Sequence, residues 1–248
     1  HFNNLTIEII CMVFMLLSAM SFALHYFSIY KSKSLKYFYD PELRFFVSIL
    51  LIIFILALSV NALSGQSNIS IRELAFHTVS TVTTTGFGIS DTSTWSFSIS
   101  FLLLIGAFIG ACSGSVGGGM KAWRVLMLLR VGFTNITKLM HPNAVAHAKM
   151  NNEKIQPSQI EAVFSFIAIY ITFFLIFMFV LIFQDVDFYS SFAGTAAAIN
   201  NLGPGLGELS ENYSSLSSFS KITLASAMIV GRLELFGVLI LLVPAYWR

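Results

Sequence analysis

The chain has 248 residues, of which 56% are hydrophobic and 10% are charged, and its mean hydropathy is +0.80. Soluble domains carry about 25% charged residues, so this chain has too few charges to cover a water-facing surface, which excludes an ordinary soluble enzyme. Several apolar runs reach the roughly 18 residues that are needed to cross a bilayer. The composition therefore predicts an all-α, multi-pass membrane protein surrounded by membrane lipid.

The basic residues do not form the dense tract that a nucleic-acid-binding surface needs, and the formal net charge is only +2. We therefore expect no nucleic-acid partner. The two cysteines, Cys11 and Cys112, both lie inside apolar segments. The sequence thus indicates neither a disulfide framework nor a cysteine metal site.

The predicted membrane spans alternate with short polar connections. They are Ile9–Tyr30, Phe45–Leu63, Phe97–Ala111 with its continuation Met120–Val131, Ala162–Phe183, and Ile222–Trp247. Lys and Arg in short loops stay on the cytoplasmic side of a membrane, and most of the 14 basic residues fall within 31–44, within 121–154 or at Arg248. These segments are predicted to be cytoplasmic. The outer mouth is predicted to be acidic, with Asp91, Asp185, Asp187, Glu208 and Glu211.

Two further segments, Ile71–Thr85 and Phe188–Asn200, are too short to span the bilayer. Each is rich in Ser, Thr or Ala, and each is followed by a pair of glycines. Non-helical backbone at membrane depth is tolerated only where it is buried in protein or lines a water-filled cavity. We therefore expect two pore helices that enter and leave the membrane on the same face, each followed by a loop.

An internal repeat relates the two regions. Thr78 and Thr195, Gly86 and Gly203, and Gly88 and Gly205 share an offset of 117 positions. The order span, pore helix, glycine loop, span thus occurs twice. The repeat predicts four segments, which are 1–44 (the last helix of a preceding repeat and a cytoplasmic loop), 45–131 (a complete repeat), 132–161 (a cytoplasmic linker) and 162–248 (a second complete repeat).

The loop Thr83–Gly88, with the sequence TTTGFG, has the composition needed to strip water from an alkali cation. Such a cation needs several neutral oxygens at once, and glycine allows consecutive carbonyls to point the same way. Thr84 can add a hydroxyl oxygen. The alternative for this loop is a simple glycine-containing turn after a Thr-rich helix.

Four motifs resemble, in order, the Trk/Ktr/HKT superfamily of potassium transporters, and specifically the membrane subunit of bacterial Trk-type uptake systems. They are TTTGFG, ACSGSVGGGMKAWR at Ala111–Arg124, NNLGPG at Asn200–Gly205, and GRLELF at Gly231–Phe236. The resemblance implies a multi-pass protein of the bacterial cytoplasmic (inner) membrane. It also implies a potassium-channel-like fold, in which repeated span–pore loop–span units surround a pseudo-fourfold pore and half of the units are present in this sequence.

The resemblance further implies channel-like uptake of potassium through a selectivity filter, with no covalent cofactor. The implied filter residues are Thr84, Thr85, Gly86, Phe87 and Gly88 in one unit and Asn201, Leu202, Gly203, Pro204 and Gly205 in the next. Potassium is expected at Thr84, Thr85, Asn201 and Leu202. Pro204 departs from the potassium-channel pattern, which has an aromatic residue there. The alternative for the second loop is a tight Gly-Pro-Gly turn.

The stretch CSGSVGGGMK interrupts the third predicted span. Each glycine costs about 1 kcal/mol relative to Ala in a helix interior, and serines compete for backbone hydrogen bonds, so the helix is expected to unwind. The resemblance implies an intramembrane gate beneath the filter. Its expected residues are Ser113, Gly114, Ser115, Val116, Gly117, Gly118, Gly119, Lys121 and Arg232.

The alternatives for these gate residues are structural. The glycines could form a helix-packing surface, and Lys121 could be a cytoplasmic anchor. Arg232 is expected near the middle of the last span, where a charge needs water or a partner. It could form an ion pair elsewhere in the bundle, although Glu234 is too close in sequence to be its main partner on a helix.

The predicted cytoplasmic segments Lys31–Arg44 and 132–159 are candidate docking surfaces for a soluble regulator. The resemblance implies a nucleotide-binding RCK-type regulatory subunit and a homodimer of the membrane subunit. His25 and His77 are expected to be packing residues rather than metal ligands.

Two other functions are consistent with part of the sequence. An ion-coupled secondary transporter, carrying potassium with sodium or protons, also has glycine-interrupted spans at matching positions. An intramembrane serine protease is suggested by the surroundings of Ser113. That chemistry requires a base close to the serine, and no histidine lies in the middle of another predicted span, so we do not expect an enzyme.

Overall fold

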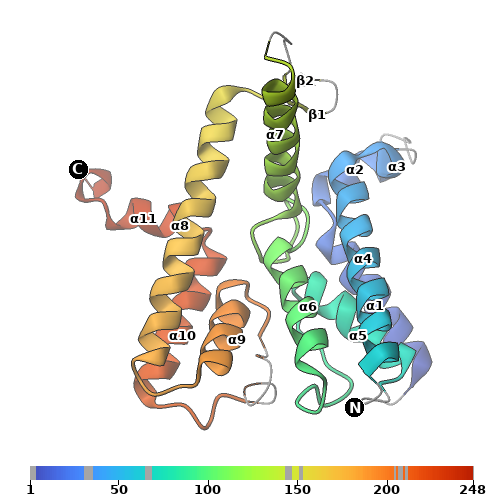
Figure 1. The fold of residues 1–248 in the computed structure, drawn as a ribbon, viewed down its shortest axis with the longest axis vertical. Helices are drawn as coiled ribbons and strands as arrows, with labels where there is room; N and C mark the ends of the chain where they lie inside the picture. Colours follow the sequence, from blue (N-terminus) through green and yellow to red (C-terminus); the bar gives the residue numbers. More distant parts are fainter. Residues whose placement is uncertain are drawn as a thin grey trace.

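The computed structural model describes residues 4–30, 36–64, 69–142, 147–150, 153–203, 205, 209 and 212–247. These residues are mostly helical (Figure 1), which confirms the all-α class. The helices are α1 (Leu5–Ala19), α2 (Phe22–Tyr30), α3 (Lys36–Tyr39), α4 (Pro41–Ser64), α5 (Ile71–Val82), α6 (Phe97–Ile109), α7 (Ala122–Met140), α8 (Pro157–Ile182), α9 (Phe188–Ile199), α10 (Ser218–Arg232), α11 (Phe236–Leu242) and the 3-10 turn η2 (Pro244–Trp247). Strands β1 (Lys149–Met150) and β2 (Glu153–Lys154) form a small antiparallel hairpin.

The predicted repeat is present in the structure. Helices α4, α5 and α6 form one unit, and α8, α9 and α10 form the next (Figure 1). The short helices α5 and α9 begin at equivalent positions of the repeat. Ser70 caps α5 by accepting a hydrogen bond from the Glu73 amide, and Asp187 caps α9 by accepting one from the Ser190 amide. A capping side chain replaces the missing backbone partners of the first turn, so both pore helices start at defined residues.

The first predicted span, Ile9–Tyr30, is not one continuous helix. Helices α1 and α2 meet at an angle of 97°. The hydrogen-bond pattern of the α-helix ends here. The Met20 amide donates to the Leu17 carbonyl, three residues back, and the Phe22 amide donates to the carbonyl of Gly114 in another part of the chain. The predicted run is therefore helical but broken, and the break was not predicted because the partner that stabilises it is distant in sequence.

The last predicted span, Ile222–Trp247, is also broken. Helix α10 ends at Arg232, Glu234 has a φ of +47°, and α11 begins at Phe236. In Figure 1, α11 and η2 extend away from the helix bundle. Arg232 is therefore the last residue of a helix and not, as predicted, a charge in the middle of a continuous span.

Two of the described helices, α4 and α8, are long and apolar enough to cross a membrane, and the bent pair α1–α2 could supply a third span. Helix α6 is a shorter apolar helix that stops at the predicted glycine-rich interruption. The C-terminal end of α7 and the β1–β2 hairpin lie at one end of the molecule, and the starts of α5 and α9 lie at the other (Figure 1). The loops predicted to face opposite sides of the membrane are thus separated.

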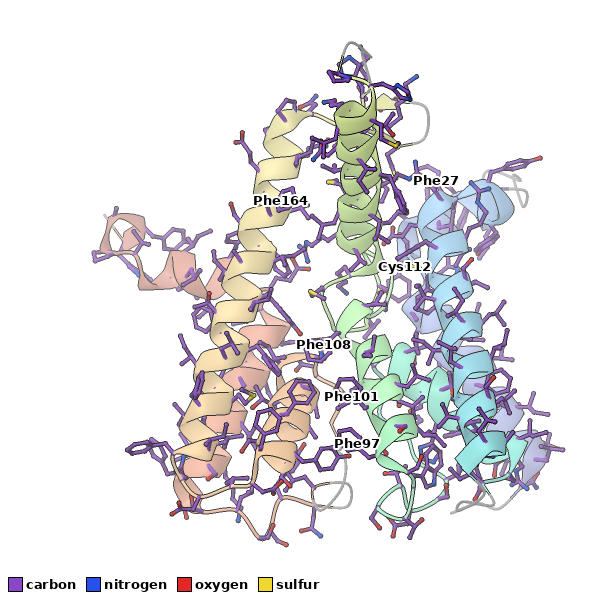
Figure 2. The ribbon with its side chains drawn as sticks, viewed as in Figure 1. Phe27, Phe97, Phe101, Phe108, Cys112 and Phe164 are labelled. Atoms are coloured by element: carbon purple, nitrogen blue, oxygen red, sulfur yellow. The ribbon has the colours of Figure 1, made fainter. Side chains whose placement is uncertain are left out.

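Aromatic side chains join the two units. Phe97 and Phe101 on α6 lie next to Tyr189 and Phe192 on α9, with ring centroids 5.0 and 5.9 Å apart. Further along α6, Phe108 meets Phe174 of α8 edge to face at 5.4 Å. The three α6 side chains line this boundary in Figure 2. Such aromatic pairs add directional contacts to ordinary packing, so they set the relative position of the two pore loops.

Helix α6 also packs closely on its own unit at Gly106. A β-carbon there would lie 2.7 Å from Cγ2 of Val82 and 2.8 Å from Cδ1 of Ile53, whereas a β-carbon at Gly132 on α7 would meet nothing within 4 Å. We expect Gly106→Ala to lower the free energy of unfolding by about 1–2 kcal/mol, since overpacking outweighs the gain in helix propensity. Gly132→Ala is the matched control and should raise it slightly. Thermal unfolding of the full-length protein in detergent tests this, and equal shifts for both variants would contradict it.

Candidate functional site

The two pore loops have the same backbone conformation. Thr84 and Asn201, which are equivalent in the repeat, have φ values of +56° and +53°, and the following Gly86 and Gly203 have φ values of +79° and +99°. A non-glycine residue rarely adopts a positive φ. That two Cβ-bearing residues do so at equivalent positions indicates that the loop geometry is imposed by its surroundings.

Hydrogen bonds to the pore helices hold both loops in this conformation. The Thr85 amide donates to the Ser80 carbonyl at 2.8 Å, and the Leu202 amide donates to the Ala197 carbonyl at 2.9 Å. Among the described residues, none donates a hydrogen bond to the carbonyls of Thr84, Thr85, Asn201 or Leu202. Both loops therefore keep these oxygens available for another partner, which is the arrangement a dehydrated cation requires.

The second loop has its own supporting contacts. The Tyr213 hydroxyl donates to the Gly203 carbonyl at 2.7 Å, and burial raises the pKa of Tyr213 to about 12, so the phenol remains protonated. Behind the loop, the Tyr170 hydroxyl donates to Oδ1 of the fully buried Asn200 at 2.6 Å. Pro204, which was predicted as a filter residue, lies outside the described residues.

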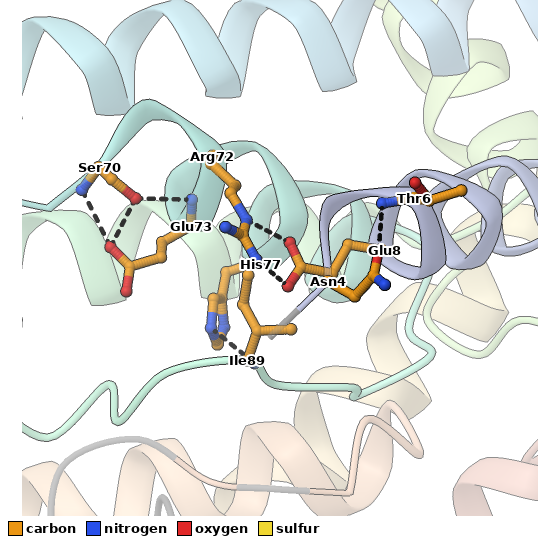
Figure 3. A network of polar contacts seen from close by, with 8 residues as sticks. All are labelled: Asn4, Thr6, Glu8, Ser70, Arg72, Glu73, His77 and Ile89. Carbon is orange, nitrogen blue, oxygen red and sulfur yellow. Dashed lines mark hydrogen bonds and ion pairs between the residues drawn. The ribbon is translucent and has the colours of Figure 1, made fainter. Parts of the chain in front are cut away.

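The first loop is supported by His77 on α5. Nε2 of His77 lies 3.4 Å from the Ile89 amide and 3.2 Å from the Ser90 hydroxyl, and the ring packs against Trp95 at 4.8 Å. The packing role predicted for His77 agrees with these contacts, which hold the chain that follows the first pore loop. Figure 3 shows the Ile89 contact within the surrounding polar network.

An ion pair in the same network fastens α5 to α1. Arg72 forms a bidentate ion pair with Glu8, in which Nε of Arg72 lies 2.5 Å from Oε2 of Glu8 (Figure 3). Glu8 is buried. Loss of Arg72 would therefore leave an uncompensated buried charge, which is strongly destabilising. Sequence reasoning missed this pair, because Glu8 precedes the first apolar run and its partner is 64 positions away.

The glycine-rich loop, Ser113–Gly119, lies against both pore loops. The Gly118 amide donates to the Thr84 hydroxyl at 2.6 Å. A β-carbon at Gly117 would be 2.9 Å from the Thr83 carbonyl oxygen, and one at Gly118 would overlap the carbonyl oxygen of Asn200. Glycine is required here because the backbone of one loop touches the backbone of two others.

The break between α1 and α2 holds the other side of the glycine-rich loop. The Cys112 amide donates to the Ala19 carbonyl at 3.0 Å, the Val116 amide donates to the Ser18 carbonyl at 3.3 Å, and the Phe22 amide donates to the Gly114 carbonyl at 3.1 Å. Each unwound segment thus supplies partners for the other. This satisfies backbone groups that would otherwise be unpaired inside the membrane.

Two cationic side chains bind carbonyls of the glycine-rich loop. Lys121 Nζ donates to the Gly117 carbonyl and lies 3.4 Å from the Ser115 carbonyl, and Arg232 donates to the Val116 carbonyl at 2.9 Å. The structure therefore brings together the residues predicted for the gate. Glu234 pairs instead with Arg124 at 2.7 Å, in agreement with the prediction that it is not the main partner of Arg232.

A buried carboxylate that the sequence did not single out completes the site. Glu42, in the first turn of α4, accepts hydrogen bonds from the Ser113 amide at 2.5 Å and from the Trp123 amide at 3.1 Å. Its side chain lies within the protein. Sequence reasoning placed Glu42 in a polar cytoplasmic loop. Its contacts were not predicted, because the two residues that donate hydrogen bonds to it are 71 and 81 positions away.

Comparison with known proteins agrees with this architecture. The family model described as "TrkH: Cation transport protein" matches residues 1–248. The chain is 38% identical to the Trk system potassium uptake proteins TrkH of Halomonas elongata and of Escherichia coli K12, over 100% of this chain and 52% of each relative. The crystal structure of the potassium transporter TrkH from Vibrio parahaemolyticus is similar with a TM-score of 0.91 at 36% identity, over 100% of this chain and 54% of that one. The chain spans about half the length of these relatives, and it belongs to the TrkH family of membrane-embedded cation transport proteins.

Proposed function

We propose that the full-length protein takes up potassium through a channel-like pore, and that this chain supplies two of its filter segments. The observation that carries the proposal is the matching geometry of the two pore loops, in which equivalent residues have positive φ values and equivalent carbonyls accept no hydrogen bond from the residues that the structure describes. Two further segments from the remainder of the protein would complete a pseudo-fourfold ring of oxygens. The potassium uptake proteins named above support potassium as the cargo.

In this proposal the carbonyls of Thr84, Thr85, Asn201 and Leu202 replace the water around potassium. Gly86, Phe87, Gly88, Gly203, Pro204 and Gly205 continue the two filter segments toward the outer mouth. Ion movement needs no covalent cofactor, because the membrane potential supplies about 2.3 kcal/mol per 100 mV for each charge. The proposed location is the bacterial inner membrane.

The glycine-rich loop is proposed to be the gate. It lies directly against Thr84 and Asn200, so its position decides whether the path below the filter is open. Lys121 and Arg232 hold its carbonyls and place positive charge beside the path. A cation below the filter would therefore meet electrostatic repulsion as well as a steric block.

The proposed partners are an RCK-type nucleotide-binding regulatory subunit and a second copy of the protein. The relatives are named as proteins of a Trk system, and this name supports a multi-component assembly. Segments 31–44 and 132–159 remain the proposed docking surfaces. The division into 1–44, 45–131, 132–161 and 162–248 is likewise proposed as the functional organisation.

An ion-coupled secondary transporter is the second candidate. The observation that favours it is the set of broken helices, α1–α2, α6–α7 and α10–α11, since discontinuous helices form the ion sites of many such transporters. It differs from the channel-like proposal in requiring a stoichiometric co-transported ion.

Gly86→Ser tests the filter. A side chain at a φ of +79° strains the loop, so we expect rubidium uptake under an imposed potential to fall at least about tenfold or to lose its preference over sodium. Gly132→Ser, at an open position of α7, is the matched control. The measurement uses the full-length protein in liposomes.

Unchanged rubidium flux and selectivity in Gly86→Ser would refute the filter assignment. Wild-type uptake that requires sodium or a proton gradient, with the regulator present, would favour the coupled transporter instead.

Gly118→Ala tests the gate. The added β-carbon would overlap the Asn200 carbonyl, so the loop must move away from the filter. We expect higher rubidium uptake in the absence of the regulator and a smaller response when it is added. Gly132→Ala provides the comparison, and a Gly118→Ala protein with normal flux and regulation would contradict the proposed gate.

A further inference from the structure

Glu42 joins three parts of the chain that are distant in sequence. It belongs to the first turn of α4, and one of its oxygens, Oε1, accepts from the Ser113 amide and from the Trp123 amide. Ser113 is where the glycine-rich loop begins, and Trp123 is in the first turn of α7, just after the loop ends. One carboxylate oxygen therefore binds the chain on both sides of the loop, at its first residue and in the helical turn that follows it.

These contacts are of the kind that hold an unwound segment in place. The amides of a first helical turn have no partner within their own helix, and a carboxylate at a helix N-terminus is favoured by the helix dipole. Glu42 is buried, and no basic side chain forms an ion pair with it among the described residues. Its hydrogen bonds to the two loop ends are what compensate for its burial.

Glu42 also lies within the predicted cytoplasmic segment 31–44, whose last residues form the start of α4. Asp40 accepts a hydrogen bond from the Leu43 amide at 2.8 Å and so caps the same turn of α4. A cavity of about 350 Å³ is lined by Ser21, Tyr39, Asp40 and Glu42, among others. Because Glu42 belongs to the first turn of α4, a displacement of this turn would move Glu42 relative to the glycine-rich loop.

We propose that Glu42 is the positioning residue of the gate. It holds both ends of the glycine-rich loop against the filter, and a displacement of the start of α4 releases them. This inference rests on the proposed gating role of the loop. Its structural part, that Glu42 keeps the loop ends in place, can be tested without any measurement of ion flux.

Cys112 is a natural reporter for this test, because it immediately precedes Ser113 and is 2% exposed. The experiment uses the full-length protein in liposomes, with its other cysteines replaced, and a small water-soluble methanethiosulfonate as the thiol reagent. Glu42→Ala removes the acceptor, and Glu42→Gln restores a neutral acceptor of the same shape. Asp40→Asn is the matched control, since it removes a neighbouring charge but can still cap α4.

Loss of a hydrogen bond to a charged group changes an equilibrium by about tenfold or more. We expect Glu42→Ala to raise the rate of Cys112 modification by about tenfold and to raise regulator-independent rubidium uptake. Glu42→Gln should recover most of the wild-type behaviour, and Asp40→Asn should behave as wild type.

Slow Cys112 modification in a folded Glu42→Ala protein would overturn the proposal, and so would equally fast modification in Asp40→Asn. Fast modification in Glu42→Ala with unchanged rubidium uptake would show that Glu42 holds the loop but that the loop does not gate. That result would refute the proposed role of Glu42 in gating. Absence of rubidium uptake in the wild type, with the regulator present, would instead count against the proposed function itself.

Discussion

Unwound backbone inside a membrane must find its hydrogen-bond partners within the protein, and this requirement organises the site. Each unpaired amide or carbonyl in hydrocarbon costs several kcal/mol. Here residues 18–22, which include the break between α1 and α2 and the helix ends on both sides of it, pair with Cys112–Val116 between α6 and α7. The Thr84 hydroxyl pairs with the Gly118 amide, and Glu42, Lys121 and Arg232 supply further partners. The glycine-rich loop is stable in this position because several elements satisfy it together.

Close backbone packing has the same origin. Gly110 packs against Gly118 and Gly119, and Gly231 packs against the Ile199 carbonyl, with no space for a β-carbon at either position. These glycines therefore lie where two backbone segments touch. Gly110, at the end of α6, touches the glycine-rich loop, and Gly231 of α10 touches the end of α9. Within the described part of the chain, the contacts to the pore loops leave the carbonyls of Thr84, Thr85, Asn201 and Leu202 without donors, so the packing that stabilises the loops also leaves oxygens available for a cation. Stability and the proposed transport function depend on the same contacts.

Local sequence patterns were sufficient to predict much of the fold. The pore helices, the repeat and the interruption after α6 were predicted because Gly and Ser clusters and the 117-residue offset are visible in the sequence. The breaks at Met20–Ser21 and Leu233–Leu235 were not predicted. The first lies in an apolar run, and its hydrogen-bond partner, Gly114, is more than 90 positions away. Glu42 and the Glu8–Arg72 pair were missed for the same reason, since a polar residue near the end of a span has no local feature that reveals a distant partner.

In the proposed pore, the two pore loops present their carbonyls to one dehydrated cation. The most direct measurement is anomalous X-ray diffraction from crystals of the full-length protein grown with thallium or rubidium. We expect anomalous density on the pore axis, within coordination distance of the carbonyl oxygens of Thr84, Thr85, Asn201 and Leu202. Bound ions found only elsewhere, with these four carbonyls turned away from them, would contradict it.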